Sequence, residues 1–289
     1  MDTDSDRARF NMIHQQIRPW DVLDERVLGV MEALRREPFV PDAYQGLAYA
    51  DIEVPLEGGR ALLAPKVVGR MLQALAVKPG DKVLEIGSGT GYGTVCLCRL
   101  GGRATGLEPD AALAAAARKH LAELDCPGAD VVELDPLSDP IPGGPYNVIA
   151  INVSLPHLDA LGRFEQQLAV GGRLFCIVGE PPVMGACLVT RLGPQAFRRE
   201  TLFETSAAPL TATPPLPDFG FLREPSGPLL SLKPRDLAEL MAQPQESLRD
   251  APVLLDVREP WEMTFCGIVG SISIPMQQIP RAIAKLDPE

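Results

Sequence analysis

Apolar residues follow two different spacings along this chain. In the first quarter they recur every three or four positions, which predicts amphipathic helices at residues 6–17, 21–37 and 65–76. Two prolines, at positions 38 and 41, follow the second of these stretches and end it. Between the second and third helices the pattern is mixed, and a double glycine at 58–59 indicates a turn.

Beyond residue 80 the pattern changes to short, continuous apolar runs. These runs predict buried strands at residues 82–86, 103–108, 129–134, 146–152 and 173–178. Helical stretches separate them, including 111–124 and 158–168, and strands that alternate with helices form βαβ units of parallel sheet. Two more strands, at 185–192 and 198–206, have no helix between them and predict an antiparallel hairpin at the edge of that sheet.

The chain is long enough for about two domains. We expect a first domain over residues 1–222, with N-terminal helices at 1–78 and a Rossmann-like α/β core at 79–222. Prolines cluster between 207 and 228, so residues 223–230 are predicted to form a stiff linker. A second α/β segment follows at 231–289.

Composition narrows the classes of function. The net charge of −11 disfavours binding to nucleic-acid backbones, which requires clustered lysines and arginines. The six cysteines include no CxxC pair, which predicts reduced thiols and no metal site. There is no apolar signal-peptide core and no run of about 20 apolar residues. We therefore expect a cytoplasmic protein that neither enters a membrane nor binds nucleic acid.

A glycine-rich loop follows the first predicted strand of the core. It comprises the residues Glu85, Ile86, Gly87, Ser88, Gly89, Thr90 and Gly91. Glycines let a backbone turn tightly and approach a ligand, and the following helix presents free N–H groups to it. The Gly-x-Gly-x-x-Gly spacing of dinucleotide-binding loops does not fit when it starts at Gly87 or at Gly89. The lysine of a P-loop is also absent from this loop. The acid before the loop would repel a pyrophosphate but suits the cationic end of S-adenosylmethionine.

Two further acids end the next two predicted strands. Glu108 closes the second strand, where a carboxylate can accept hydrogen bonds from both ribose hydroxyls. Asp135 follows the third strand, where it can accept a bond from the adenine amino group. The carboxyl ends of parallel strands share the crevice in which open α/β sheets bind ligands. Together with the loop, these acids predict an S-adenosylmethionine site.

Residues from about 11 to 221 resemble the protein-L-isoaspartate O-methyltransferase family. The matching segments are residues 11–17, 39–41, 47–51, 79–92, 145–149 and 171–174. The resemblance implies a seven-stranded methyltransferase fold with N-terminal helices, S-adenosylmethionine as methyl donor and the α-carboxyl of L-isoaspartyl residues as acceptor. It also implies a protein-repair reaction in which the methyl ester collapses to a succinimide.

The sequence departs from this family in the segment after the double glycine. The family carries a threonine and a serine there whose hydroxyls contact the substrate, but this chain has Ala61 and Leu63. No catalytic side chain can therefore be assigned. One interpretation is a changed acceptor pocket lined by Arg60, Asn152, Ser154 and His157, for an isoaspartyl peptide or another small acceptor. The other is a cofactor-binding or sensing module without efficient catalysis.

Residues 231–289 resemble the first half of a rhodanese domain. The resemblance rests on the runs at 254–262 and 267–276. A full domain of this kind carries an active-site cysteine loop further along the chain, and Cys266 does not occupy that position. We therefore expect an incomplete rhodanese-like domain that performs no sulfur transfer.

Overall fold

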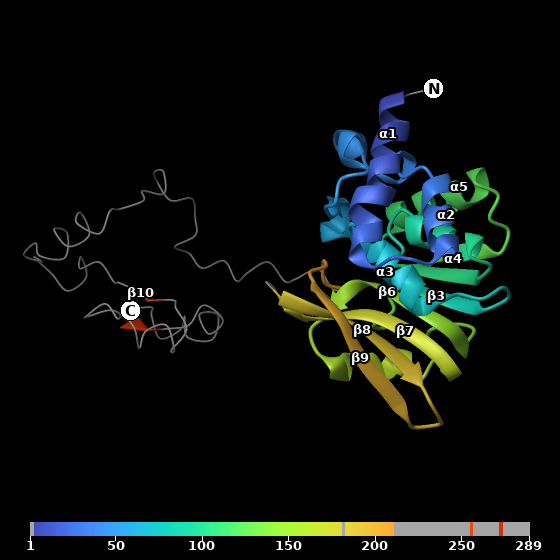
Figure 1. Cartoon of the computed structure of the whole chain (residues 1–289). Helices are drawn as coiled ribbons and strands as arrows, with labels where there is room; N and C mark the ends of the chain where they lie inside the picture. Colours follow the sequence, from blue (N-terminus) through green and yellow to red (C-terminus); the bar gives the residue numbers. More distant parts are fainter. Residues whose placement is uncertain (1–2, 181–182, 211–254, 257–271, 274–289) are drawn as a thin grey trace, which may run out of the picture. The chain divides into compact units, whose positions relative to one another are not determined.

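The structure is a computed structural model, and it describes residues 3–180, 183–210, 255–256 and 272–273. The chain divides into two units, Met1–Pro217 and Asp218–Glu289. Figure 1 colours the first unit from blue to orange along the sequence.

A seven-stranded sheet forms the centre of the first unit. Its strands lie in the order β5-β4-β3-β6-β7-β8-β9. Their bounds are β3 Lys82–Ile86, β4 Arg103–Glu108, β5 Ala129–Glu133, β6 Tyr146–Leu155, β7 Leu168–Glu180, β8 Val183–Arg191 and β9 Phe197–Thr205. The pairs from β5 to β7 are parallel, whereas β8 runs antiparallel to both of its neighbours. The predicted α/β methyltransferase-type sheet and its antiparallel hairpin are thereby confirmed.

Helices precede the sheet and connect its strands. The N-terminal elements are α1 Thr3–Asn11, the π-helix η1 Met12–Ile17, the 3-10 turn η2 Arg18–Trp20, α2 Glu25–Ala33, the 3-10 turns η3 Glu37–Phe39 and η4 Asp42–Leu47, and α3 Pro65–Leu75. The connecting helices are α4 Tyr92–Arg99, α5 Ala111–Glu123, η6 Leu158–Leu161 and α6 Gly162–Glu165. In Figure 1 the N-terminal helices lie on one side of the sheet.

Two of the predicted helices are shorter than expected. The second begins only after Asp24, whose carboxylate accepts the Arg26 N–H, because Asp21 adopts a left-handed conformation (φ +59°) that interrupts the chain. It ends where Leu34 becomes extended. The helix predicted at 158–168 is two short turns, because β7 already begins at Leu168, which pairs with Tyr146.

Side chains on both faces of the sheet are buried. Val83 and Val148 belong to a core cluster that includes the N-terminal helices, while Leu84 and Ile149 belong to a second cluster with Phe164 of α6. Parallel strands covered on both faces carry continuous apolar runs rather than alternating ones. This explains why the core strands were predictable from short runs.

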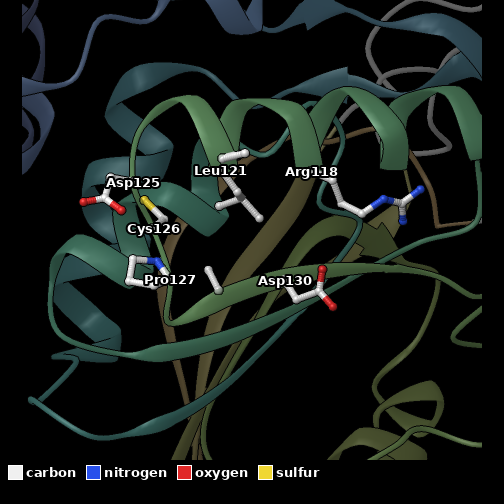
Figure 2. Close-up of a pocket in the computed structure, with 8 residues that line it drawn as sticks. Arg118, Leu121, Asp125, Cys126, Pro127 and Asp130 are labelled. Atoms are coloured by element: carbon white, nitrogen blue, oxygen red, sulfur yellow. The ribbon is translucent and has the colours of Figure 1, made fainter.

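Side-chain hydrogen bonds and an ion pair lie at the two edge strands of the sheet. At the β5 edge, Arg118 of α5 donates to the Val131 carbonyl (2.8 Å) and Asp130 accepts the Val131 N–H (2.8 Å). Figure 2 shows the shallow hollow between α5 and β5 that these side chains flank, with a volume of about 260 Å³. At the opposite edge, Arg199 of β9 makes a bidentate pair with the buried Glu165 of α6. Satisfied edges resist pairing with other chains.

The described part of the second unit is small. The strand β10 (Leu255–Asp256) pairs in parallel with β11 (Ile272–Ser273). The predicted linker at 223–230 and most of the rhodanese-like segment at 231–289 lie outside the described residues. Over the described ranges, no helix combines the length and apolar character that a membrane crossing requires.

Candidate functional site

The glycine loop lies between β3 and α4. Gly87, Gly89 and Gly91 have φ values of +73°, +53° and +90°, in the region that favours glycine. The space around the loop is also tight, since a Cβ on Gly87 would lie 2.9 Å from a Val153 methyl carbon. A Cβ on Gly91 would lie 3.0 Å from the Cβ of Ala117 in α5. Backbone and packing therefore both require glycines here.

Glu85 is completely buried beneath this loop. Its carboxylate accepts hydrogen bonds from the Thr94 hydroxyl of α4 and from Asn152 Nδ2 of β6 (2.6 Å). Burial raises the pKa of Glu85 to about 7, although both hydrogen bonds favour the charged form. The structure thus brings Glu85 together with Asn152, which was predicted as an acceptor residue. Thr94 was missed by the sequence analysis.

Glu108 lies at the end of β4 and contacts the loop directly. It is fully buried, and its Oε2 accepts the Gly89 N–H at 2.8 Å while Oε1 accepts the Asp110 N–H at 3.2 Å. Burial raises the pKa of Glu108. Arg60 Nε lies 3.9 Å from Oε1. A carboxylate fixed by two backbone donors beside a glycine loop is preorganised to accept further hydrogen bonds.

The glycine loop borders a small cavity of about 20 Å³, which has room for roughly one water molecule. It is lined by Leu56, Ala61, Leu62, Leu63, Val68, Met71, Gly87, Ser88, Gly89, Tyr92, Gly93 and Asn152. Three buried polar atoms of lining residues, Ser88 Oγ, Tyr92 Oη and Asn152 Oδ1, have no hydrogen-bond partner among the described residues. Buried polar atoms without partners are costly, so they fit a polar ligand such as S-adenosylmethionine.

A short hairpin covers the loop. Its strands are β1 (Val54–Pro55) and β2 (Ala61–Leu62), joined by the turn η5 (Glu57–Gly59). Leu56 approaches Gly89 so closely that a Cβ there would lie 3.0 Å from its Cδ1. Arg60 donates to the carbonyls of Pro209 (3.2 Å) and Leu210.

Arg60 was predicted to attract an anionic acceptor. In the structure its guanidinium is instead engaged by two carbonyls and by Glu108, all on its own chain. Ser154 was expected on a loop after the fourth strand, but β6 continues to Leu155 and Ser154 lies within it. Its backbone bonds to residues 208 and 210, and its buried hydroxyl donates to the Ala207 carbonyl (3.0 Å). Ser154 therefore holds the 207–210 segment in place.

The two remaining predicted residues lie outside the lining of this cavity. Asp135 sits in the turn after β5, where Oδ1 accepts the Leu137 N–H (2.9 Å) and Oδ2 accepts the Ser138 hydroxyl (2.9 Å). His157 is exposed in the turn between β6 and η6, and its carbonyl accepts the Ala160 N–H. The structure brings neither side chain to the glycine loop.

Arg36 is a buried residue of the site that sequence analysis missed. It has no exposed surface, and its Nη2 donates to the Leu63 carbonyl at 2.6 Å. Its guanidinium lies 4.7 Å from the centre of the Tyr92 ring, at the start of α4. Burial lowers the pKa of Arg36. Arg36 thus links the altered segment at Leu63 to the helix that follows the glycine loop.

Comparison with known proteins follows this geometry. The family model "Protein-L-isoaspartate(D-aspartate) O-methyltransferase (PCMT)" matches residues 7–211. A protein-L-isoaspartate O-methyltransferase of Koribacter versatilis is 38% identical over 71% of this chain and 90% of its own length. One from Methylorubrum populi is 36% identical over 71% of this chain and 96% of its own length.

Among solved structures, one is described as a PCMT of Plasmodium falciparum in complex with S-adenosyl-L-homocysteine. It has a TM-score of 0.60 at 19% identity, and the match covers 70% of this chain and 98% of that one. At this identity the likeness supports the fold alone. Together with the family model and the relatives, it leads to one assignment: the chain belongs to the protein-L-isoaspartate(D-aspartate) O-methyltransferase family and is an S-adenosylmethionine-dependent methyltransferase.

Proposed function

We propose that this chain methylates the α-carboxyl of L-isoaspartyl residues in proteins and peptides, as a step of protein repair. The observation that carries the proposal is the family match over residues 7–211, which includes both the glycine loop and the hairpin above it. The paired buried acids at the loop support it, since they offer carboxylates to the cationic end and to the ribose of the cofactor.

The cofactor half of the site uses the loop and its acids. S-adenosylmethionine supplies an electrophilic methyl group bound to a positively charged sulfur. We assign its binding to Gly87, Gly89 and Gly91 with Ser88, Thr90, Glu85, Glu108 and Asp135. Glu108 would hold the ribose and Glu85 would face the amino group. Thr90 contributes by holding the loop in place, because its hydroxyl donates to the Phe39 carbonyl (2.7 Å). Asp135 would reach the adenine only after its turn rearranges.

The acceptor half requires alignment rather than acid–base chemistry. A carboxylate with a pKa near 4 is already ionised at pH 7, so no general base is required. Catalysis is then mostly a matter of holding the carboxylate in line with the methyl group. Ala61 and Leu63 offer no hydroxyl for this purpose, and they line the cavity beside the loop. Of the four predicted acceptor residues, Asn152 lines this cavity. Arg60 would reach an acceptor only by exchanging its bonds to the Pro209 and Leu210 carbonyls, and Ser154 and His157 are engaged or placed elsewhere.

A methyl-transfer assay with radiolabelled cofactor tests the proposal. We expect transfer to a peptide that contains L-isoaspartate and none to the same peptide with normal aspartate. Restoring both hydroxyls, with Ala61→Thr and Leu63→Ser, should raise kcat/KM about tenfold or more, because each new bond to a carboxylate contributes roughly 1.5–3 kcal/mol. Cofactor binding by calorimetry without transfer to any isoaspartyl peptide would overturn the proposal.

A second candidate is a cofactor-binding module that has lost efficient catalysis. The apolar side chains of Ala61 and Leu63 favour it. In this reading the first domain (1–222) senses S-adenosylmethionine and a linker (223–230) joins it to a rhodanese-like segment (231–289). The parallel pairing of β10 with β11 supports an α/β segment there. We place the protein in the cytoplasm, without nucleic-acid partners. Persulfide on Cys266 after thiosulfate treatment would contradict the expected lack of sulfur transfer.

A further inference from the structure

A second cavity lies behind the glycine loop. Its volume is about 320 Å³, within the range of small-molecule sites. The lining residues come from α1, from the stretch between the end of α2 and η3 inclusive, from the end of α4, and from α5 with the residue after it. They are Arg9, Ala33, Leu34, Arg35, Pro38, Arg99, His120, Glu123 and Leu124. We call this the arginine cavity. It shares no lining residue with the cavity at the glycine loop.

Positive charge dominates the rim of the arginine cavity. Arg9 and Arg35 both pair with the single carboxylate of Asp6, at 3.1 and 3.3 Å. Arg99 has no carboxylate within salt-bridge distance in the described part of the chain, and Glu123 pairs with a lysine of its own helix. Three arginines and one acid, Glu123, thus line this cavity, while Asp6 and Glu37 lie near Arg9 and Arg35 outside the lining. The excess of arginines over acids in the lining favours a bound anion.

The floor of the same cavity is apolar. Ala33, Leu34, Pro38 and Leu124 line it, and Leu34 is a buried core residue. A bare inorganic ion would leave these groups uncovered. The lining therefore matches an organic anion whose headgroup meets the guanidiniums and whose apolar body covers the floor.

His120 connects the arginine cavity to the glycine loop. Its Nδ1 donates to the Thr90 carbonyl at 2.9 Å, since a carbonyl can only accept. Its ring packs on Phe39 with 4.7 Å between the ring centres. The Thr90 hydroxyl in turn donates to the Phe39 carbonyl (2.7 Å). His120 thus lines the arginine cavity and also hydrogen-bonds to the glycine loop.

We propose that the arginine cavity binds a small organic anion, a phosphate or carboxylate with an apolar body, and that this binding strengthens cofactor binding at the glycine loop. A ligand against His120 fixes the ring that hydrogen-bonds to the Thr90 carbonyl, so it acts on the loop through that bond. The coupling is reciprocal, because each ligand must then raise the affinity of the other by the same factor.

Calorimetry on the full chain tests binding, with phenyl phosphate and benzoate as probes. We expect saturable binding of at least one of them, weaker binding of inorganic phosphate, and none of benzyl alcohol, which lacks the charge. Arg99→Gln should weaken binding at least tenfold. Arg198→Gln, an exposed arginine on β9, should change it less than twofold. No saturable binding of either probe, equal binding of benzyl alcohol, or equal losses in the two variants would overturn the site.

A second titration tests the coupling. The Kd of S-adenosylhomocysteine is measured in the wild type with and without a saturating probe. We expect at least threefold tighter binding with the probe present, and no change in the Arg99→Gln protein. An unchanged or weaker affinity in the wild type would overturn the coupling. Neither titration depends on methyl transfer, so the result stands apart from the proposed reaction.

Discussion

Glu108→Gln is the substitution to which cofactor affinity should respond most clearly. The Glu108 carboxylate is fully buried and already fixed by the Gly89 and Asp110 N–H groups. A ribose diol would add two charge-assisted hydrogen bonds, each contributing roughly 1.5–3 kcal/mol. Glutamine keeps one acceptor oxygen and loses the charge, so one bond is lost and the other weakened. The expected cost is about 2–4 kcal/mol, or roughly 30- to 1000-fold in Kd.

Calorimetry with S-adenosylhomocysteine measures this loss without turnover. Glu133→Gln is the matched control, because Glu133 pairs with Glu108 in the register of β4 and β5 but is exposed. The Kd of the Glu133→Gln protein for S-adenosylhomocysteine should change less than twofold. A glutamine cannot accept both the Gly89 and the Asp110 N–H, so a urea titration of the variant should accompany calorimetry to establish that binding is measured on folded protein. A Glu108→Gln protein that binds within threefold of the wild type would refute the ribose assignment.

Three further outcomes follow from buried groups and close contacts. Burial raises the pKa of Glu85 from 4.5 to about 7, so the folded state binds its proton more tightly than the unfolded state. The free energy of unfolding should therefore fall by up to about 3 kcal/mol as pH rises from about 4.5 to 7. Between pH 5 and pH 8 the urea midpoint should fall less for Glu85→Gln than for the wild type. Equal falls in the two proteins would contradict this. Arg199→Ala removes the guanidinium that pairs with the buried acid of α6 and should lower the free energy of unfolding by about 1–3 kcal/mol in a urea titration. The neighbouring Arg198→Ala should lower it by less than about 0.5 kcal/mol. Similar losses in the two variants would contradict a special role for the buried pair. Gly93→Ala would place a Cβ 2.1 Å from the Glu85 carboxylate and should lower the melting temperature, whereas Gly29→Ala in α2 meets no atom within 4 Å and should not lower it.

The central parallel strands were predictable because most of their residues are buried. The bounds of β3 and β4 match the predicted runs at 82–86 and 103–108. The failures have long-range causes. The strand β6 extends to Leu155 because Ser154 and Leu155 pair with Ile177 and Val178 of β7, which no local pattern reveals. Ser154 also bonds to a segment more than 50 residues away. The second helix was misplaced because Asp21 and Asp24 are both good N-caps, and only the fold selects one.

The residues of the candidate site also fall into those fixed by local sequence features and those fixed by distant contacts. The loop, Glu85 and Glu108 were predictable, because strand ends and glycine spacing are local features. Arg36 was not, because its hydrogen bond to Leu63 depends on how the N-terminal segment folds over the sheet. Arg60 was identified from its position, but its contacts with residues 209 and 210 depend on a distant stretch of chain.

Transfer of labelled methyl from S-adenosylmethionine to a matched pair of peptides, which differ only in L-isoaspartate or aspartate at one position, is the most direct test of the proposed reaction. We expect base-labile label on the isoaspartyl peptide alone. We also expect loss of that label, at subsaturating cofactor, in the Glu108→Gln protein. Equal labelling of both peptides, or no labelling by a wild-type chain that binds the cofactor, would contradict the proposed reaction.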